Sequence, residues 1–213
     1  MSFNGVVKEL SNAIEKNNGK FEFKIIVKSL ISVYNRGDVY TYCSCLHRDT
    51  KIKLLDGTTP TVSEMLDRYN NGESLYVYSV DSNGDFVPGV VEKVWITGER
   101  SDFIEITLDN DQVITTTPEH LYMLRDGNYL PASELTVGQS LMPLYFNEKN
   151  GYELVKKNSS KGWSSTYKEV ANYFKKDEIE LAENRATPED GMNYLFAIHH
   201  KDFNKKNNTP ENL

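Results

Sequence analysis

Five short runs of strand-forming residues follow one another in the middle of this 213-residue chain, and they constrain its fold more than any other feature. The turn sequences DSNG, TGERSD and DND lie between successive runs, and RDGN closes the last one. The runs cover residues 75–80, 86–96, 103–108, 112–116 and 121–125. Strands at such short spacing favour an all-β sandwich or a barrel-like body. We therefore predict a mainly β protein.

A hairpin and one helix are predicted just before these strands. The alternating run 51–55 ends at Asp56-Gly57, a dipeptide typical of a hairpin turn. Thr61 and Glu64 form a capping-box pattern ahead of an apolar pair, and residues 70–72, Asn-Asn-Gly, provide an end signal. The sequence thus predicts a short helix between them.

The segments on either side of this β-rich region have different sequence patterns. Apolar residues recur at helical spacing over 6–14, which predicts an amphipathic helix, and DVYTYCS predicts a strand that ends near Ser44. The run 166–184 predicts further helix. We divide the chain into residues 1–44, residues 45–144 and residues 145–213.

Charge and hydropathy restrict the function classes. Residues 45–144 hold seven basic and sixteen acidic residues, which disfavours nucleic acid as a partner, whereas residues 145–213 hold eleven of each. No apolar run approaches the roughly 18 residues that a membrane helix needs. The N-terminus has no basic stretch followed by an apolar core, so we expect a cytoplasmic protein without a membrane partner.

The two cysteines, Cys43 and Cys45, are poorly placed to staple a fold, and a reducing compartment would keep both as thiols. About seventy residues after Cys45, the run TTTPEH places Thr117 and His120 three positions apart. Each residue alone has an ordinary explanation, since a lone cysteine is commonly a small buried apolar side chain. Their combination indicates chemistry.

A cysteine that opens a β-rich module, TTTPEH further on and the closing run ASELTVGQSLMPL together resemble the N-terminal part of an intein, the self-excising element of the Hint family. The resemblance implies that the Cys45 thiol attacks the carbonyl of Ser44 and converts the Ser44-Cys45 peptide bond to a thioester. It assigns His120 as general acid to the scissile nitrogen and Thr117 to hydrogen bonding. No cofactor is implied, and residues 1–44 would belong to a host protein.

One departure from the intein pattern matters. Complete splicing needs a His-Asn pair before a Cys, Ser or Thr, and the sequence contains no His-Asn pair. We therefore expect thioester formation or cleavage before Cys45, with ligation only when a C-terminal intein half or downstream polypeptide supplies the rest. Whether Cys43 helps to bind metal in the rejoined host, or is a buried thiol, stays open.

The final run HHKDFNKKNNTPENL resembles the opening of an HNH nuclease motif, a ββα metal finger. The resemblance implies that His199 binds a divalent metal such as Mg²⁺, that His200 is the general base and that Asn212 pins the loop. The motif's helix and further ligand do not follow within the sequence. We expect a partial ββα segment without nuclease activity of its own, and DNA as a partner only if the motif is completed.

The expected architecture is thus a Hint-type β fold, preceded by a small α/β host segment and followed by the partial ββα segment. Two alternatives stay open. One is a Hint-type autoprocessing toxin precursor with an HNH nuclease, and the other is a catalytically silent β-rich binding or structural protein.

Overall fold

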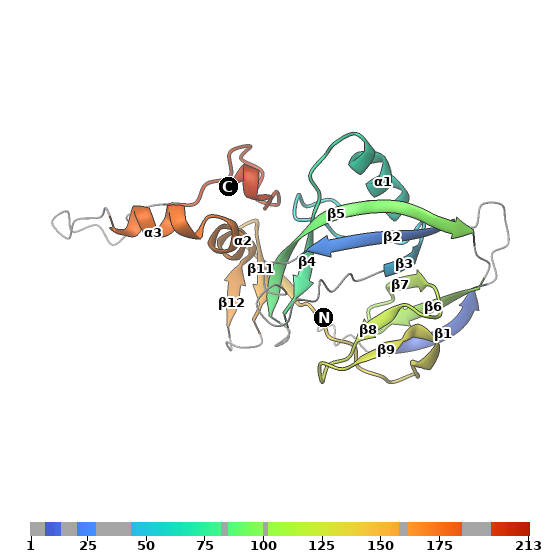
Figure 1. Cartoon of the computed structure of the whole chain (residues 1–213). Helices are drawn as coiled ribbons and strands as arrows, with labels where there is room; N and C mark the ends of the chain where they lie inside the picture. Colours follow the sequence, from blue (N-terminus) through green and yellow to red (C-terminus); the bar gives the residue numbers. More distant parts are fainter. Residues whose placement is uncertain are drawn as a thin grey trace.

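The computed structural model describes residues 7–13, 21–28, 44–81, 85–99, 102–157, 162–184 and 197–213. Its main body is a seven-stranded sheet in the order β1-β6-β7-β3-β2-β5-β4, and every pairing in it is antiparallel (Figure 1). The strands are β1 (Val7–Ala13), β2 (Phe21–Lys28), β3 (Ser44–His47), β4 (Tyr76–Val80), β5 (Phe86–Glu99), β6 (Phe103–Leu108) and β7 (Val113–Thr116). The predicted mainly β class is confirmed.

The strands predicted from the turn spacing are present with small shifts at their ends. The last run forms β8 (Leu121–Met123), which pairs with β9 (Tyr129–Pro131) in a separate hairpin. At its tip, Asp126 accepts a hydrogen bond from the Asn128 amide at 3.0 Å, and Gly127 has a φ of 88°. After β9 the chain makes a 3₁₀ turn over Ala132–Glu134, and Leu141 then bridges back to Leu124.

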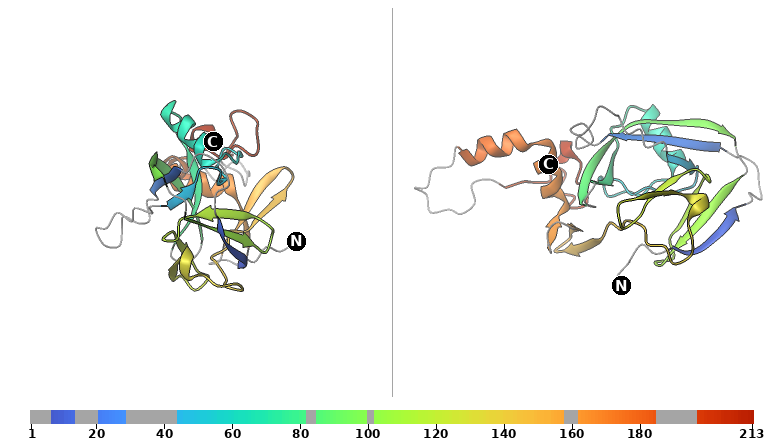
Figure 2. Two further views of the ribbon diagram at one scale, coloured as in Figure 1. Left: turned by 90° about the vertical axis from the view of Figure 1, so that its right-hand side faces the viewer. Right: turned by 60° about the horizontal axis from the view of Figure 1, so that its bottom comes forward.

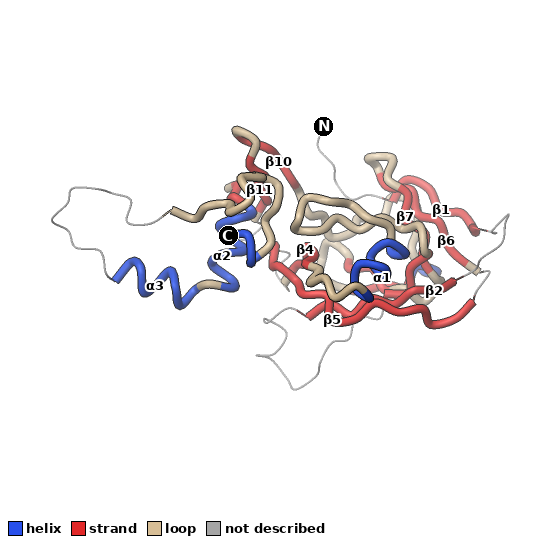
Figure 3. The backbone as a smooth tube through the Cα atoms, turned by 90° about the horizontal axis from the view of Figure 1, so that it is seen from above, coloured by secondary structure: helices blue, strands red, loops and turns tan. Residues whose placement is uncertain are grey.

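The predicted hairpin and helix are also confirmed. The amides of Ile52 and Leu54 donate to the carbonyls of Pro60 and Thr58, both at 2.9 Å, so the 51–61 segment closes at Asp56-Gly57. Helix α1 (Val62–Asn70) begins with both hydrogen bonds of the capping box between Thr61 and Glu64. It lies over β5 and β2 in Figure 3, and its buried Val62 and Met65 pack with core residues of β4 and β5.

The predicted N-terminal helix is wrong, because residues 7–13 form strand β1, antiparallel to β6. Val7 is 1% exposed and packs with Ile106 and Leu108. Pairing with the edge of the sheet gives this short run both ladder hydrogen bonds and burial of apolar side chains. Together these stabilise it more than its weak intrinsic helix propensity would. The described parts of the expected α/β host segment are therefore strands of the main sheet, while Cys43 and most of the strand predicted at DVYTYCS lie outside the described residues.

The C-terminal third forms a smaller unit beside the main sheet (Figures 1 and 2). It contains a three-stranded sheet of β10 (Phe146–Lys149), β11 (Tyr152–Lys156) and β12 (Trp163–Ser165), followed by α2 (Thr166–Phe174) and α3 (Lys176–Asn184). The predicted helical run is thus confirmed but is divided at Lys175. Its apolar residues Val155, Val170 and Ala171 share one buried cluster with Leu55 and Phe86 of the main body. No helix in the described ranges is long and apolar enough to span a bilayer.

Candidate functional site

Ser44 and Cys45 begin strand β3, in the interior of the main sheet between β7 and β2. On one side, Ser44 pairs with Ile25 and Cys45 pairs with Lys24 of β2. On the other side, Leu46 pairs with Thr116, the last residue of β7. The backbone at the predicted scissile bond therefore runs as an extended strand in the middle of a sheet.

The register between β3 and β7 brings the predicted Thr117 close to Cys45. Leu46 pairs with Thr116, and Cys45 and Thr117 are the residues next to this pair, just where the pairing ends. Residues about seventy positions apart in the sequence thus become neighbours in space.

His120 is held in the same turn as Thr117. Its amide donates to the Thr117 carbonyl at 3.1 Å, which closes a four-residue turn with Pro118 at the second position, where proline is favoured. The 3₁₀ turn after β9 is hydrogen-bonded to this four-residue turn. The Ala132 amide donates to the His120 carbonyl at 2.8 Å, and the Ser133 amide donates to the Pro118 carbonyl at 3.0 Å. The backbone of the TTTPEH run is therefore fixed.

Two buried side-chain polar atoms in this turn, Thr117 Oγ1 and His120 Nδ1, have no hydrogen-bond partner among the described residues. The Thr117 side chain is completely buried. A buried polar atom without a partner costs about 1–3 kcal/mol, so folded proteins rarely retain one. Finding two in a single turn indicates a site prepared to bind a polar group.

The surroundings of His120 keep its imidazole uncharged. Its ring stands edge-on to Tyr122, with ring centroids 4.6 Å apart, and the Tyr122 hydroxyl lies 3.3 Å from Thr116 Oγ1. Burial lowers the pKa of His120 to about 4. The same burial raises the pKa of Tyr122 above its ordinary value. At neutral pH, His120 is therefore a neutral group that can accept a proton and return it.

The two histidines predicted for the nuclease-like tail have contrasting surroundings. His199 is exposed, with its ring 5.6 Å from that of Phe203. His200 is 4% exposed, and its Nε2 lies 3.3 Å from Asn208 Oδ1. The rings of Tyr152 and Tyr167 enclose His200 at centroid distances of 5.8 and 5.3 Å. The adjacent histidines thus differ in access to solvent.

Asn212 lies at the centre of the loop that carries these histidines. Its side-chain amide donates to Asp202 Oδ1 at 2.9 Å and to the Asn207 carbonyl at 2.8 Å, while its Oδ1 accepts from the Asp202 amide at 3.0 Å. The Lys201 amide also donates to the Asn212 carbonyl at 2.8 Å. These bonds close the 201–212 loop on itself.

The two tail histidines are not joined by further metal-ligating side chains within the described ranges. In the described ranges, no three His, Cys, Asp or Glu side chains gather as a metal site would require. His199 faces solvent, whereas Nε2 of His200 is directed at Asn208. We derive no metal-dependent step from this arrangement.

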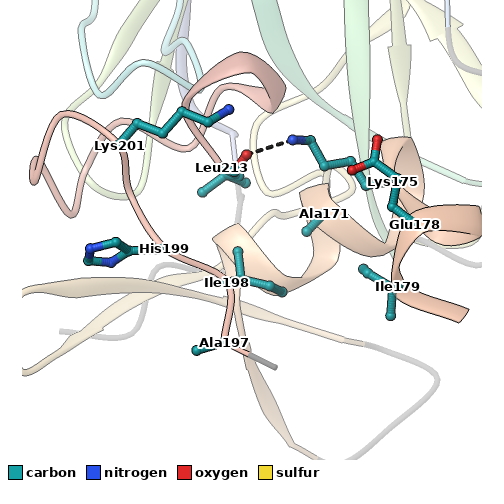
Figure 4. Close-up of a pocket in the computed structure, with 9 residues that line it drawn as sticks. All are labelled: Ala171, Lys175, Glu178, Ile179, Ala197, Ile198, His199, Lys201 and Leu213. Atoms are coloured by element: carbon teal, nitrogen blue, oxygen red, sulfur yellow. Dashed lines mark hydrogen bonds between the residues drawn. The ribbon is translucent and has the colours of Figure 1, made fainter. Parts of the chain in front are cut away.

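A pocket of about 310 Å³ lies between helices α2 and α3 and the tail (Figure 4). Ala171, Ile179 and Ile198 contribute apolar walls. The Lys175 ammonium donates to the main-chain oxygen of Leu213 at 2.6 Å, so this basic group is already engaged. The pocket is separate from the Thr117–His120 turn.

Sequence reasoning missed a buried carboxylate that joins the two parts of the chain. Glu153 of β11 is 8% exposed and accepts hydrogen bonds from Tyr78 at 2.5 Å, from Thr166 at 3.0 Å and from Lys53. Burial, with Glu153 alongside, raises the pKa of Tyr78 well above its ordinary value. Nothing in the local pattern of β11 distinguishes Glu153 from an ordinary surface residue.

Comparison with known proteins gives one informative similarity. No protein-family model matches the chain. The B subunit of the DNA gyrase of Synechocystis sp. is 32% identical over 178 residues, which cover 79% of this chain. The chain spans 16% of the length of that relative.

Proposed function

We propose that this chain is the N-terminal part of an intein-containing precursor, in which Cys45 begins protein splicing. In the first step Cys45 Sγ bonds to the carbonyl carbon of Ser44, and the bond from that carbon to the Cys45 nitrogen breaks. The thiol loses its proton and the released nitrogen gains one. The products are a thioester on Cys45 and its free α-amino group, so atoms and charge balance.

The observation that carries this proposal is a pair of buried polar atoms that have no hydrogen-bond partner among the described residues. Thr117 Oγ1 and His120 Nδ1 lie in the turn that follows β7, and the β3–β7 register sets this turn beside Cys45. A site that must polarise a peptide carbonyl and protonate its nitrogen needs one hydrogen-bonding group and one proton carrier. The buried Thr117 hydroxyl and the His120 imidazole, whose Nδ1 is buried, match these needs.

The low pKa of His120 is consistent with one order of proton transfers. With a pKa of about 4, the imidazole is neutral at pH 7, so its unprotonated nitrogen can accept the thiol proton. The resulting imidazolium is strongly acidic because its site is buried, so it transfers the proton readily to the departing nitrogen. One histidine thus moves one proton from sulfur to nitrogen, while Thr117 hydrogen-bonds the scissile peptide group.

The gyrase relative supports the position of the element within the chain. Its match covers 79% of 213 residues, or about 168, whereas only 44 residues precede Cys45. Most of the similarity therefore lies from Cys45 onward, in the proposed splicing module and tail. The matched region is a small fraction of a much longer protein, as expected for an element lodged within a host.

The proposal also defines the partners of the chain. We propose that a C-terminal intein half supplies the asparagine step that this sequence lacks, and that the reaction occurs in a reducing, cytoplasmic compartment where Cys45 stays a thiol. Residues 145–213 would be part of an HNH segment with His199, His200 and Asn212 in the roles given above. Its action on DNA, with a divalent metal, would depend on completion of the motif.

Cleavage by an added nucleophile tests the proposed function. Hydroxylamine or dithiothreitol should split the purified chain into fragments of 44 and 169 residues, because either reagent intercepts the thioester. Cys45→Ala should stay intact, while Cys43→Ala is the matched control and should be cleaved like the wild type. A wild-type chain that stays intact would overturn the proposal and favour a catalytically silent β-rich protein.

A further inference from the structure

We infer that strand β2 is a positioning element for the acyl shift, supplied by the very segment that the reaction removes. This inference rests on the proposed function of Cys45. β2 pairs directly with the scissile residues, Ile25 with Ser44 and Lys24 with Cys45. The scissile peptide is therefore held from the β2 side by residues upstream of the cleavage point.

The place of β2 in the sheet makes it an interior strand. It lies between β3 and β5, and its pairing with β5 runs over the whole of Phe21–Lys28, whereas its pairing with β3 covers residues 22–25 (Figure 1). Loss of β2 would leave β3 without one neighbour and separate it from β5 and β4. The sheet that holds the scissile bond is thus built partly from the segment that leaves.

Two-sided pairing matters because an acyl shift depends on geometry. β2 pairs with both Ser44 and Cys45 on one side, and on the other side the end of β7 pairs with the next residue, Leu46. A reacting group displaced by 1 Å can lose about 100-fold in rate. The β2 pairing at Ser44 and Cys45, together with the β7 pairing at Leu46, therefore holds the scissile backbone in place.

The same pairing predicts the fate of the N-terminal segment after the peptide bond breaks. Residues 1–44 are held by β1 against β6 and by β2 against both β3 and β5. These contacts do not depend on the bond between residues 44 and 45. The released segment should therefore stay in the sheet, close to Cys45.

Proline substitutions in β2 test the positioning role. Successive amides of a strand point to opposite neighbours, so one of Lys24 and Ile25 directs its N–H toward β3, and proline there removes it. We expect whichever of Lys24→Pro and Ile25→Pro removes the N–H directed toward β3 to slow dithiothreitol-induced cleavage about 100-fold. Val27→Pro is the matched control, because Val27 pairs with Val91 of β5 and lies beyond the β3 pairing. The Val27→Pro variant should be cleaved within about threefold of the wild-type rate, because Val27 lies outside the residues that pair with β3.

A second measurement on the unmodified chain covers the case in which the proline variants fail to fold. After hydroxylamine cleavage of the wild type, the 44-residue fragment should elute with the remainder in size-exclusion chromatography and separate only in denaturant. Separate elution under native conditions would overturn the inference, as would equal slowing by Val27→Pro. If the wild type is not cleaved at all, the proposed function fails instead, so the two failures are distinguishable.

Discussion

The buried imidazole of His120 should make the stability of the protein depend on pH in a way that one substitution removes. Burial holds the pKa of His120 at about 4, below the ordinary value of 6.5. As pH falls, the unfolded chain therefore binds a proton at this residue before the folded chain does. The folded state is therefore favoured most by neutral His120 above pH 6.5, and this contribution to the free energy of unfolding is lost as pH falls from 6.5 toward 4.

The size of this effect follows from the difference between the two pKa values. Their full separation corresponds to a ceiling of about 3 kcal/mol, because one pH unit is equivalent to about 1.4 kcal/mol. Between pH 7 and pH 4.5, most of the separation is crossed. The folded state should thus lose about 2 kcal/mol from His120 alone over this interval.

Urea unfolding of the wild type and of His120→Gln at pH 7 and pH 4.5 measures this loss. Carboxylates such as Asp56, whose pKa is lowered by hydrogen bonds from Thr58 and Arg68 against the opposing effect of burial, also contribute in acid. They contribute equally to both proteins, so the difference between the two isolates His120. Between pH 7 and pH 4.5, the free energy of unfolding of the wild type should fall by about 2 kcal/mol more than that of His120→Gln.

A matched control is His199→Gln, which removes a histidine from the exposed tail. This substitution leaves the Thr117–His120 turn unchanged, so the loss of stability that depends on His120 should persist. If His120→Gln and the wild type lose the same stability within about 0.5 kcal/mol, the imidazole is not in a buried, partnerless site, and the reasoning about its resting charge is refuted.

Three further substitutions have definite expected outcomes. Thr117→Val removes a buried hydroxyl that has no hydrogen-bond partner among the described residues. The free energy of unfolding in urea should therefore stay level or rise by up to about 1 kcal/mol, while thiol-induced cleavage slows. A loss of more than about 1 kcal/mol would show that the hydroxyl has a partner. Tyr78→Phe removes one donor from buried Glu153 and should cost about 1–3 kcal/mol in thermal or urea unfolding, with no loss refuting the bond. Thr61→Ala breaks the capping box and should cost about 1 kcal/mol, whereas Thr61→Ser should restore most of it.

Local signals predicted much of the main body correctly. The capping box of α1 and the turn at Asp56-Gly57 depend on residues a few positions apart, so the sequence alone specifies them. The error at residues 7–13 has the opposite origin. Val7 pairs with Leu108, about a hundred positions away, and no local pattern reports an open sheet edge at that distance.

The sequence predicts a set of site residues but not their environment. The motif predicts Cys45, Thr117 and His120 as site residues, whereas the low pKa of the histidine arises from burial that only the folded chain provides. The role of β2 has no signal in its own residues, because it depends on the register with Ser44 and Cys45. The role of Glu153 likewise depends on hydrogen bonds from Lys53 and Tyr78, which lie far from it in the sequence.

The most direct test of the central claim is mass spectrometry of the chain after treatment with hydroxylamine at neutral pH. Attack on a thioester at Cys45 should yield residues 1–44 with a hydroxamate on the Ser44 carbonyl, together with a fragment that begins with a free Cys45 amine. The account predicts both products from the wild type and neither from Cys45→Ala. An undivided wild-type chain, or the same two fragments from Cys45→Ala, would contradict it.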